Sequence, residues 1–195
     1  MYCARRGRIF NPNSTRPQGS PRGIFEVIEL GPDIVDHLPK GSTNPGIIFD
    51  ADDTLAPHDS PKLFDRVLEM LVTLESSGIP FVVVSNNRDR ELARQRAEAL
   101  GITEERYIIP EGILDMKPSP RMVRRAINTL GGKTCDVLAV GDGMTDTIAY
   151  RLAGVAMENI RTLHGIHEPL GYPGRAKVRR AWYWLLGLNT MTDPS

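Results

Sequence analysis

Residues 46–55 read GIIFDADDTL, a short apolar run that ends in a group of acids. A short apolar run bounded by turn-forming residues is typical of a strand that is buried on both faces. Asp50 closes the run, and Asp52 and Asp53 follow it almost directly. The sequence therefore predicts a buried strand over 46–50 with several carboxylates at and just past its end.

Similar apolar runs recur along the chain and alternate with segments of helical spacing. In the helical segments apolar residues recur every three to four positions, and a glycine follows the last of them. The expected strands are 46–50, 81–84, 107–109, 137–140 and 155–160. The expected helices are 61–77, 88–100, 119–130 and 145–152, with a further element near 24–30. Strands that alternate with helices predict an α/β fold in three layers, a parallel sheet with helices on both faces.

The composition is that of one ordinary globular domain. The chain has 195 residues, of which 41% are hydrophobic and 25% charged. Lys and Arg total 24, as do Asp and Glu, so no excess of charge points to nucleic acid as a partner. No segment reads as a signal peptide or a membrane span, and the two cysteines, Cys3 and Cys135, indicate no disulfide framework. We therefore expect a cytoplasmic protein.

The chain divides into three parts by composition. Residues 1–23 are rich in Arg, Pro, Gly, Ser and Asn and are expected to be a disordered basic tail. The strand and helix patterns occupy 24–170, the expected folded domain. Residues 171–195 are a C-terminal segment that holds both tryptophans, and 175–188 read RAKVRRAWYWLLGL. This basic, Trp-bearing sequence fits a helix at an anionic membrane surface, or a terminal helix that docks on the domain or on a second subunit.

Polar residues suited to phosphoryl transfer follow the predicted strands. In sheets of this kind, ligands bind at the carboxyl ends of the strands. One carboxylate can attack phosphorus while a second donates and accepts a proton. Mg²⁺ with oxygen ligands would offset the crowded negative charge, and hydroxyl and amine groups would hold the other phosphate oxygens. The residues in question are Asp50, Asp52, Thr54, Ser85, Asn86, Lys117, Asp142 and Asp146.

Four segments, in order, resemble the motifs of the haloacid dehalogenase superfamily: DADDTL, SNN, Lys-Pro and GDGMTD. The resemblance covers roughly residues 46–160. It implies that Asp50 is the nucleophile and a magnesium ligand, and that Asp52 is the general acid and base whose backbone carbonyl also binds the metal. An acid two residues after the nucleophile favours phosphoester hydrolysis. The remaining implied roles are phosphate or substrate binding by Thr54, Ser85 and Asn86, charge neutralisation by Lys117, and metal binding by Asp142 and Asp146.

Within the superfamily the chain resembles the YqeG-like group, which includes mitochondrial phosphatidylglycerophosphatase. The likeness lies in the IIFDxDxTL start, the SNN and Lys-Pro motifs and the basic C-terminal segment. The chain departs from that group in the three residues, rather than four, between Asp142 and Asp146. The likeness implies phosphatidylglycerophosphate as the substrate, with peripheral membrane contact through 175–188. One alternative is a phosphatase of a soluble sugar phosphate or nucleotide, whose subunits cover each other's sites in a homo-oligomer. Another is a non-catalytic regulator that binds phosphate or phospholipid.

Loop lengths predict a site without a cap domain. Only residues 56–60 separate the first motif from the next helix, and one helix, one strand and short connections use up 87–116. A capless site is open and suits a large or surface-bound substrate. Several polar residues near the motifs have structural interpretations as well: Asp53 as a turn residue, Asn86 as a residue that shapes its loop, Asn87 and Ser119 as helix N-caps, and His58 as a solvated loop residue.

Overall fold

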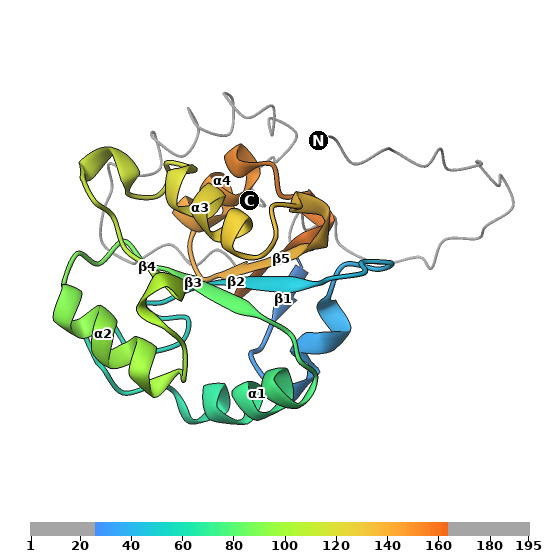
Figure 1. Cartoon of the computed structure of the whole chain (residues 1–195), viewed down its shortest axis with the longest axis horizontal. Coiled ribbons are helices and arrows are strands. Elements are labelled where there is room, and N and C mark those ends of the chain that lie inside the picture. Colours follow the sequence, from blue (N-terminus) through green and yellow to red (C-terminus); the bar gives the residue numbers. More distant parts are fainter. Residues whose placement is uncertain (1–25, 164–195) are drawn as a thin grey trace, which may run out of the picture.

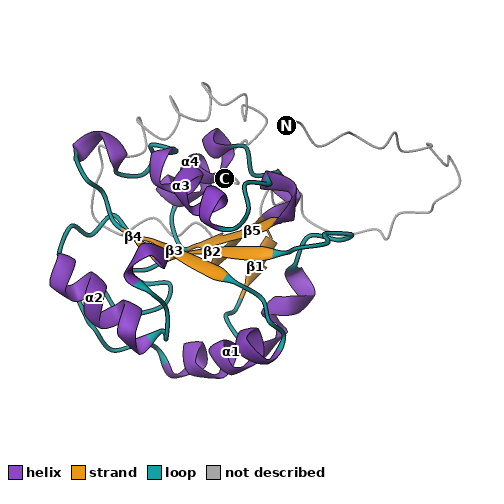
Figure 2. Cartoon of the chain, in the orientation of Figure 1, coloured by secondary structure: helices purple, strands orange, loops and turns teal. Residues whose placement is uncertain are grey.

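The computed structural model describes residues 26–163, which form a parallel sheet covered by helices on both faces (Figures 1 and 2). The sheet has six strands in the order β1-β6-β5-β2-β3-β4, and every neighbouring pair is parallel. The strands are β1 (Glu26–Ile28), β2 (Gly46–Asp50), β3 (Phe81–Val84), β4 (Tyr107–Ile108), β5 (Val137–Gly141) and β6 (Ile160–Leu163). The helices are α1 (Asp65–Ser76), α2 (Arg90–Ala99), α3 (Arg121–Thr129) and α4 (Met144–Ala153). The predicted α/β fold is confirmed.

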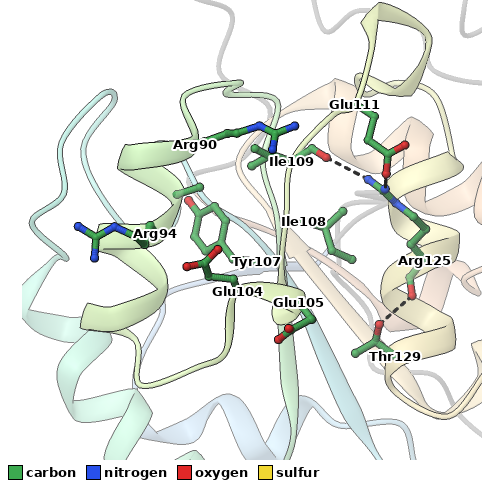
Figure 3. Close-up of a pocket in the computed structure, with 11 residues that line it drawn as sticks. Arg90, Arg94, Glu104, Glu105, Tyr107, Ile108, Ile109, Glu111, Arg125 and Thr129 are labelled. Carbon is green, nitrogen blue, oxygen red and sulfur yellow. Dashed lines mark hydrogen bonds and ion pairs between the residues drawn. The ribbon is translucent and has the colours of Figure 1, made fainter.

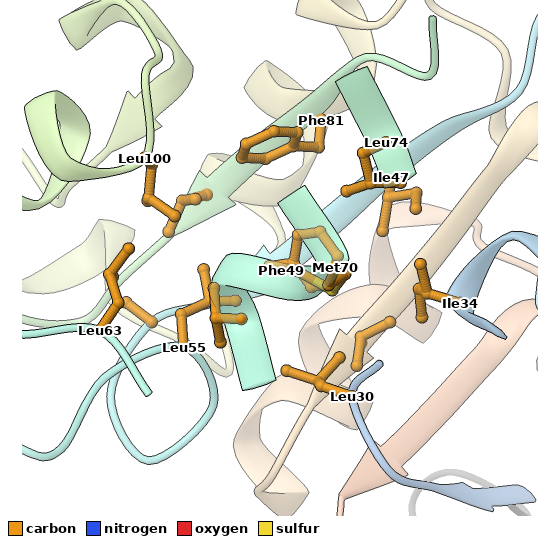
Figure 4. Packing of buried hydrophobic residues seen from close by; sticks show 14 of the residues in the cluster. Leu30, Ile34, Ile47, Phe49, Leu55, Leu63, Met70, Leu74, Phe81 and Leu100 are labelled. Carbon is orange, nitrogen blue, oxygen red and sulfur yellow. The ribbon is translucent and has the colours of Figure 1, made fainter. Parts of the chain in front are cut away.

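The central strands are buried on both faces, which explains why their sequences are apolar without alternation. Within β2, Ile47 and Phe49 belong to one core cluster and Ile48 belongs to the other. The first cluster also contains Val67 and Met70 of α1, and Figure 4 shows this packing. The second cluster is built by α3 and α4 on the opposite face. Two cores on one sheet hold the ends of the central strands firmly in place.

Short 3-10 turns complete the layers. The turn η1 (Pro32–His37) buries Ile34 beside α1, and η2 (Glu104–Arg106) leads into β4. From residue 87 to residue 116 the regular elements are α2, η2, β4 and the turn η3 (Ile113–Asp115), and no helix or strand lies between β2 and α1. The prediction that the chain has no cap domain at these two places is therefore confirmed. Two further turns, η4 (Thr134–Asp136) and η5 (Met157–Asn159), precede β5 and β6.

Several predicted boundaries are wrong. The helix expected from residue 61 begins at Asp65, and the one expected from 88 begins at Arg90, because the carboxylate of Asp89 caps it through the N–H groups of Glu91 and Leu92. Ser119 is not an N-cap, since α3 begins at Arg121. The strand expected over 155–160 is displaced to β6, which begins at Ile160 after the turn η5. Sequence periodicity is least informative at the ends of helices and strands. Of the three helices, only α2 has a side-chain cap at its start.

Three expectations concern the chain outside the sheet. The predicted tail of residues 1–23 and the segment 171–195 lie outside the described residues. Cys135 is disulfide-bonded, so the expectation of no disulfide is wrong. Sequence distance alone does not tell which sulfur atoms come together in space. Between residues 26 and 163, no helix is long and apolar enough to cross a membrane.

Candidate active site

The predicted site residues meet where β2, β3 and β5 end. Asp50 is the last residue of β2, Ser85 follows β3 and Asp142 follows β5, and β2 lies between the other two strands. The chain leaves β2 toward α1 on one face and leaves β5 toward α4 on the other. Connections that diverge from adjacent parallel strands leave a crevice between them, the usual ligand site of such sheets.

The side chain of Lys117 is buried between two carboxylates of this crevice. Its Nζ is ion-paired with Oδ1 of Asp50 and, at 2.5 Å, with Oδ1 of Asp146, and it donates to the carbonyl of Val84 at 2.9 Å. The hydroxyl of Thr54 donates to Oδ2 of Asp50 at 3.0 Å. Both oxygens of Asp50 are thus held by donors, which fixes the direction in which this carboxylate faces.

Three carboxylates converge beside Lys117. Asp50, Asp142 and Asp146 each place an oxygen within 4.8 Å of the others. Asp146 lies in the first turn of α4, and its Oδ2 accepts the N–H of Gly143 at 3.0 Å. Its Oδ1 is buried and has the ion-pair contact with Lys117 but no directed hydrogen bond. The cluster therefore carries more acceptor oxygens than its own donors satisfy.

Gly141 makes this close approach possible. A Cβ atom at this position would lie 2.7 Å from Cβ of Asp146 and 3.0 Å from its carboxylate carbon. Real Cβ atoms are not found so close to another carbon, so any side chain here would displace the first turn of α4. The glycine at the end of β5 is therefore a requirement of the carboxylate cluster.

The electrostatics of the crevice reflect crowding of negative charge in a buried place. Burial, reinforced by the charge of Asp146, raises the pKa of Asp50 to about 7 although Lys117 opposes the shift. Burial, with the charges of Asp146 and Asp53, raises the pKa of Asp142 to about 6. For Lys117, burial alone would lower the pKa, but the charges of Asp146 and Asp50 outweigh it, so its pKa lies above the ordinary value.

This donor set fits a hard divalent cation. Mg²⁺ prefers oxygen ligands and is commonly held by a few carboxylates. Burial raises the pKa values of Asp50 and Asp142 and the repulsion among the three acids adds to it. A cation beside Asp50, Asp142 and Asp146 would offset that repulsion, and the buried Oδ1 of Asp146 is an available acceptor. Of the four residues that the motifs imply as metal ligands, the three that would bind through carboxylates are thus brought together.

Asp52 lies beside this cluster but is bound by a different cation. Its Oδ1 accepts from Nη1 of Arg96 at 2.9 Å, and its Oδ2 accepts from the hydroxyl of Ser85 at 3.2 Å. No sequence motif indicates a role for Arg96. One feature of the sequence could have drawn attention to it. Arg96 lies in α2 four residues after Leu92 and four before Leu100, so a charged residue interrupts the apolar face of the helix.

Asn86, expected either to contact substrate or to shape its loop, is hydrogen-bonded to the backbone of Lys117. Its Nδ2 donates to the carbonyl of Lys117 at 3.1 Å, and its Oδ1 accepts the N–H of Lys117 at 2.6 Å. Both ends of the amide therefore hold the backbone that presents the lysine.

Two further residues near the motifs have the structural roles that the sequence suggested. Asp53 has the left-handed backbone (φ 59°) and the backbone hydrogen bond of a turn residue, and the side chain of His58 is 67% exposed.

A separate hollow of about 390 Å³ lies at the outer edge of the sheet, next to β4 (Figure 3). It is lined by side chains of α2, η2, β4 and α3, among them Arg90, Tyr107 and Arg125. Arg125 donates to the carbonyl of Ile109 at 2.9 Å and is ion-paired with Glu111. The predicted site residues do not line this hollow, so it does not bear on their chemistry.

Comparisons with known proteins point to one family. Residues 51–154, over half of the chain, match the haloacid dehalogenase-like hydrolase family. A phosphoglycolate phosphatase of Neisseria gonorrhoeae is 36% identical over 86 residues, which are 43% of this chain and 36% of that protein. The Bacillus subtilis protein named "probable phosphatase YqeG" is 32% identical over 104 residues, 53% of this chain and 56% of its own length. The chain thus spans about a third to a little over half of the length of these relatives.

Among solved structures, a haloacid dehalogenase family hydrolase of Deinococcus radiodurans, with bound phosphate and sodium, superposes with a TM-score of 0.45 at 18% identity. The superposition covers 73% of this chain and 97% of that structure.

Proposed function

Because the chain belongs to the haloacid dehalogenase-like hydrolases, we propose that it hydrolyses phosphate monoesters through a phosphorylated aspartate at Asp50. The observation that supports this most directly is the position of Asp50. Its carboxylate is ion-paired with Lys117 and lies within 4.8 Å of the oxygens of Asp142 and Asp146. A nucleophilic carboxylate needs cations around it, because the phosphate it attacks is itself an anion.

In the first step, an oxygen of Asp50 forms a bond to phosphorus while the bond from phosphorus to the ester oxygen breaks. The electron pair goes to the leaving oxygen, which takes a proton from the carboxyl group of Asp52, and an alcohol departs. In the second step, Asp52 accepts a proton from water as the water oxygen attacks phosphorus. Inorganic phosphate leaves and the carboxylate of Asp50 is restored. Transfer of one proton in each direction by the same group is ordinary general acid–base catalysis.

Other residues hold the phosphoryl group during these steps. Lys117 neutralises charge on Asp50 and on the transferred phosphate, and Ser85 offers a hydroxyl group at the same end of the sheet. Thr54 acts through Asp50 instead, because its one hydroxyl proton is donated to Oδ2 of that carboxylate. Asp50, Asp142 and Asp146, with the backbone carbonyl of Asp52, would hold Mg²⁺. When bound, the ion supplies positive charge that stabilises the phosphoryl oxygens as negative charge develops.

The absence of a cap between residues 51 and 120 supports an open site that admits a large phosphate ester. One of the two named relatives is a phosphoglycolate phosphatase and the name of the other states no substrate, so the substrate class is a further proposal. Phosphatidylglycerophosphate is our first choice, through the likeness to the YqeG-like group and the basic segment 175–188, which lies outside the described residues. A soluble sugar phosphate or nucleotide is the alternative.

Turnover of an aryl phosphate by the full chain tests the proposal, with and without chelator. We expect hydrolysis in Mg²⁺, none in chelator, and none by Asp50→Asn, since an amide forms no acyl phosphate. Asp53→Asn is the matched control, because it makes the same change at an exposed turn position. Phosphate binding without turnover by the unsubstituted protein would instead support the non-catalytic regulator. Phosphatidylglycerophosphate, 2-phosphoglycolate and sugar phosphates, assayed side by side, identify the substrate class.

A further inference from the structure

Arg96 is an arginine in an unusual place, since its side chain is 1% exposed in the interior of the domain. It projects from the buried face of α2, together with Leu92 and Ala97. Burial of a guanidinium is costly unless its charge is paired and its N–H groups are bonded. The contacts of Arg96 therefore indicate what the residue is for.

Each nitrogen of the guanidinium has a partner. Nε donates to the carbonyl of Ser60 at 2.7 Å, and Nη2 donates to the carbonyl of Pro57 at 3.0 Å. Nη1 donates to Oδ1 of Asp52 at 2.9 Å and lies 3.3 Å from the hydroxyl oxygen of Tyr107. Of these four contacts, two hold the loop after the first motif, one reaches the hydroxyl of Tyr107, and one joins the guanidinium to the carboxylate of Asp52.

The contact with Asp52 is the one that requires charge. Neutral donors would suffice for two carbonyl groups and a phenol, but a carboxylate that is only 17% exposed needs a cation or several donors. His58 is the other basic group near it, yet His58 is 67% exposed and its Nδ1 is 3.8 Å away, beyond hydrogen-bond distance. Arg96 is therefore the buried cation that pairs with this acid.

Ser85 is the second anchor of Asp52, but it has a competing task. Its hydroxyl has one proton, which it donates to Oδ2 of Asp52 at 3.2 Å. In the function proposed above, the same hydroxyl binds a phosphoryl oxygen, and it then releases Oδ2. The bond from Arg96 to Oδ1 remains, so Oδ2 is left facing the substrate on a carboxyl group that stays fixed.

We propose that Arg96 is a positioning residue, which holds the carboxyl group of Asp52 through Oδ1 so that its other oxygen exchanges a proton with the leaving group. This inference rests on the proposed function. It differs from a purely structural role, in which Arg96 only fastens the loop of residues 57–60 and has no effect on proton transfer.

The two roles differ in how the loss depends on the leaving group. A weakly basic leaving group, such as a nitrophenolate, departs without a proton, whereas an alkoxide does not. Loss of the positioned acid therefore lowers kcat/KM for an alkyl phosphate more than for an aryl phosphate. Loss of structural support lowers both equally. The ratio of the two kcat/KM values is independent of the fraction of active protein, because that fraction cancels.

The experiment measures this ratio for the full chain in Mg²⁺, with the substitutions Arg96→Met, Asp52→Asn and both together. We expect Arg96→Met to lower the alkyl-to-aryl ratio by about tenfold or more, a part of the effect of Asp52→Asn. In the Asp52→Asn background, Arg96→Met should leave the ratio unchanged, since it acts through Asp52. Arg94→Met is the control, because Arg94 is an exposed arginine of the same helix, paired with Glu91 and Glu98.

Two outcomes overturn the inference. One is an alkyl-to-aryl ratio in Arg96→Met that equals that of the unsubstituted protein. The other is that Arg96→Met lowers this ratio as much in the Asp52→Asn background as it does alone. If Arg96→Met yields no folded protein, Arg96→Lys decides in the same way, because it keeps the charge and loses the fixed geometry. A lowered alkyl-to-aryl ratio in Arg96→Lys supports the positioning role, and an unchanged ratio overturns it. Failure of the proposed function is distinguishable, since the unsubstituted protein would then hydrolyse neither substrate.

Discussion

At the scale of single residues, the crevice is a balance of charges on side chains that are mostly buried. Lys117 compensates part of the negative charge of Asp50 and Asp146, but the pKa values of Asp50 and Asp142 remain raised to about 7 and about 6. Charge left uncompensated in a buried site costs folding stability, and natural sites bear that cost where a ligand needs it. Substitutions at these residues are therefore expected to change both the stability and the activity of the protein.

Removal of the lysine should show how much the protein depends on this balance. We expect Lys117→Met to abolish turnover and to lower the free energy of unfolding by about 3 kcal/mol at pH 8 in chelator, because it leaves buried carboxylates unpaired. Urea unfolding followed by circular dichroism measures the loss. Lys62→Met, at an exposed position, is the control and should change stability by less than about 0.5 kcal/mol. A Lys117→Met protein as stable as its parent would show that the ion pairs contribute nothing net.

The raised pKa values predict how stability depends on pH in the absence of metal. The folded protein binds protons at Asp50 and Asp142 more tightly than the unfolded chain, whose ordinary value is 3.8. This contribution to stability is therefore complete below about pH 4. It is lost as the pH rises through about 6 for Asp142 and about 7 for Asp50.

The measurement is the free energy of unfolding in chelator at several pH values between 4.5 and 8, for the unsubstituted chain and for Asp50→Asn. We expect the difference in favour of Asp50→Asn to grow with pH, by at most about 1.4 kcal/mol per unit, because asparagine does not titrate. A difference that is constant with pH would mean that Asp50 titrates alike in the folded and unfolded chain.

At the scale of elements, the site depends on where strands end and helices begin. β5 ends at Gly141, and the first turn of α4 returns so closely that Asp146 packs on that glycine. On the other side, the loop after β2 is fastened by α2 through Arg96, and the loop before α3 is fastened through Asn86. The helices and strands thus bring together at one site side chains that are far apart in the sequence.

The contact between β5 and α4 can be tested by adding one methyl group. We expect Gly141→Ala to displace Asp146, to weaken Mg²⁺ binding at least about tenfold and to cost about 1–3 kcal/mol of stability, as is typical when a packed place receives an extra carbon. Gly112→Ala is the matched control, because a Cβ atom there meets nothing within 4 Å. Titration calorimetry with Mg²⁺ measures the affinity, and equal affinities in the two variants would contradict the packing argument.

At the scale of the whole molecule, the carboxylate cluster joins parts that fold around different core faces. Asp50 ends a central strand, Asp142 lies in a loop and Asp146 lies in α4. A cation bound to all of them would bridge the sheet and a helix layer and would bind only the folded chain. Its binding would then stabilise the entire domain, by an amount that rises with the logarithm of the cation concentration.

We accordingly expect Mg²⁺ at a hundred times its dissociation constant to stabilise the unsubstituted protein by about 2.7 kcal/mol, seen as a rise in Tm. Asp142→Asn should lack most of this rise, yet be more stable than its parent in chelator, because it removes one charge from the crowded cluster. A lower Tm for Asp142→Asn in chelator would mean that the carboxylate is needed for the fold itself.

Much of this architecture is predictable from the chain alone. The apolar runs that become β2, β3 and β5 are visible without a structure, as are the four motifs, because periodicity and spacing are properties of neighbouring residues. Membership of the haloacid dehalogenase-like hydrolases, first indicated by those motifs, is confirmed. Since the carboxyl ends of parallel strands share one edge, the convergence of Asp50, Asp142 and Asp146 could also be predicted.

Other features depend on how the elements pack. Three contacts of the site join residues that lie in different parts of the chain. They are the ion pair of Arg96 with Asp52, the hydrogen bonds of Asn86 with the backbone of Lys117, and the close packing of Asp146 on Gly141. A sequence pattern records which residues a helix or strand turns toward the interior. The distance between two side chains that meet there is set by the docking of whole elements, which no local pattern contains.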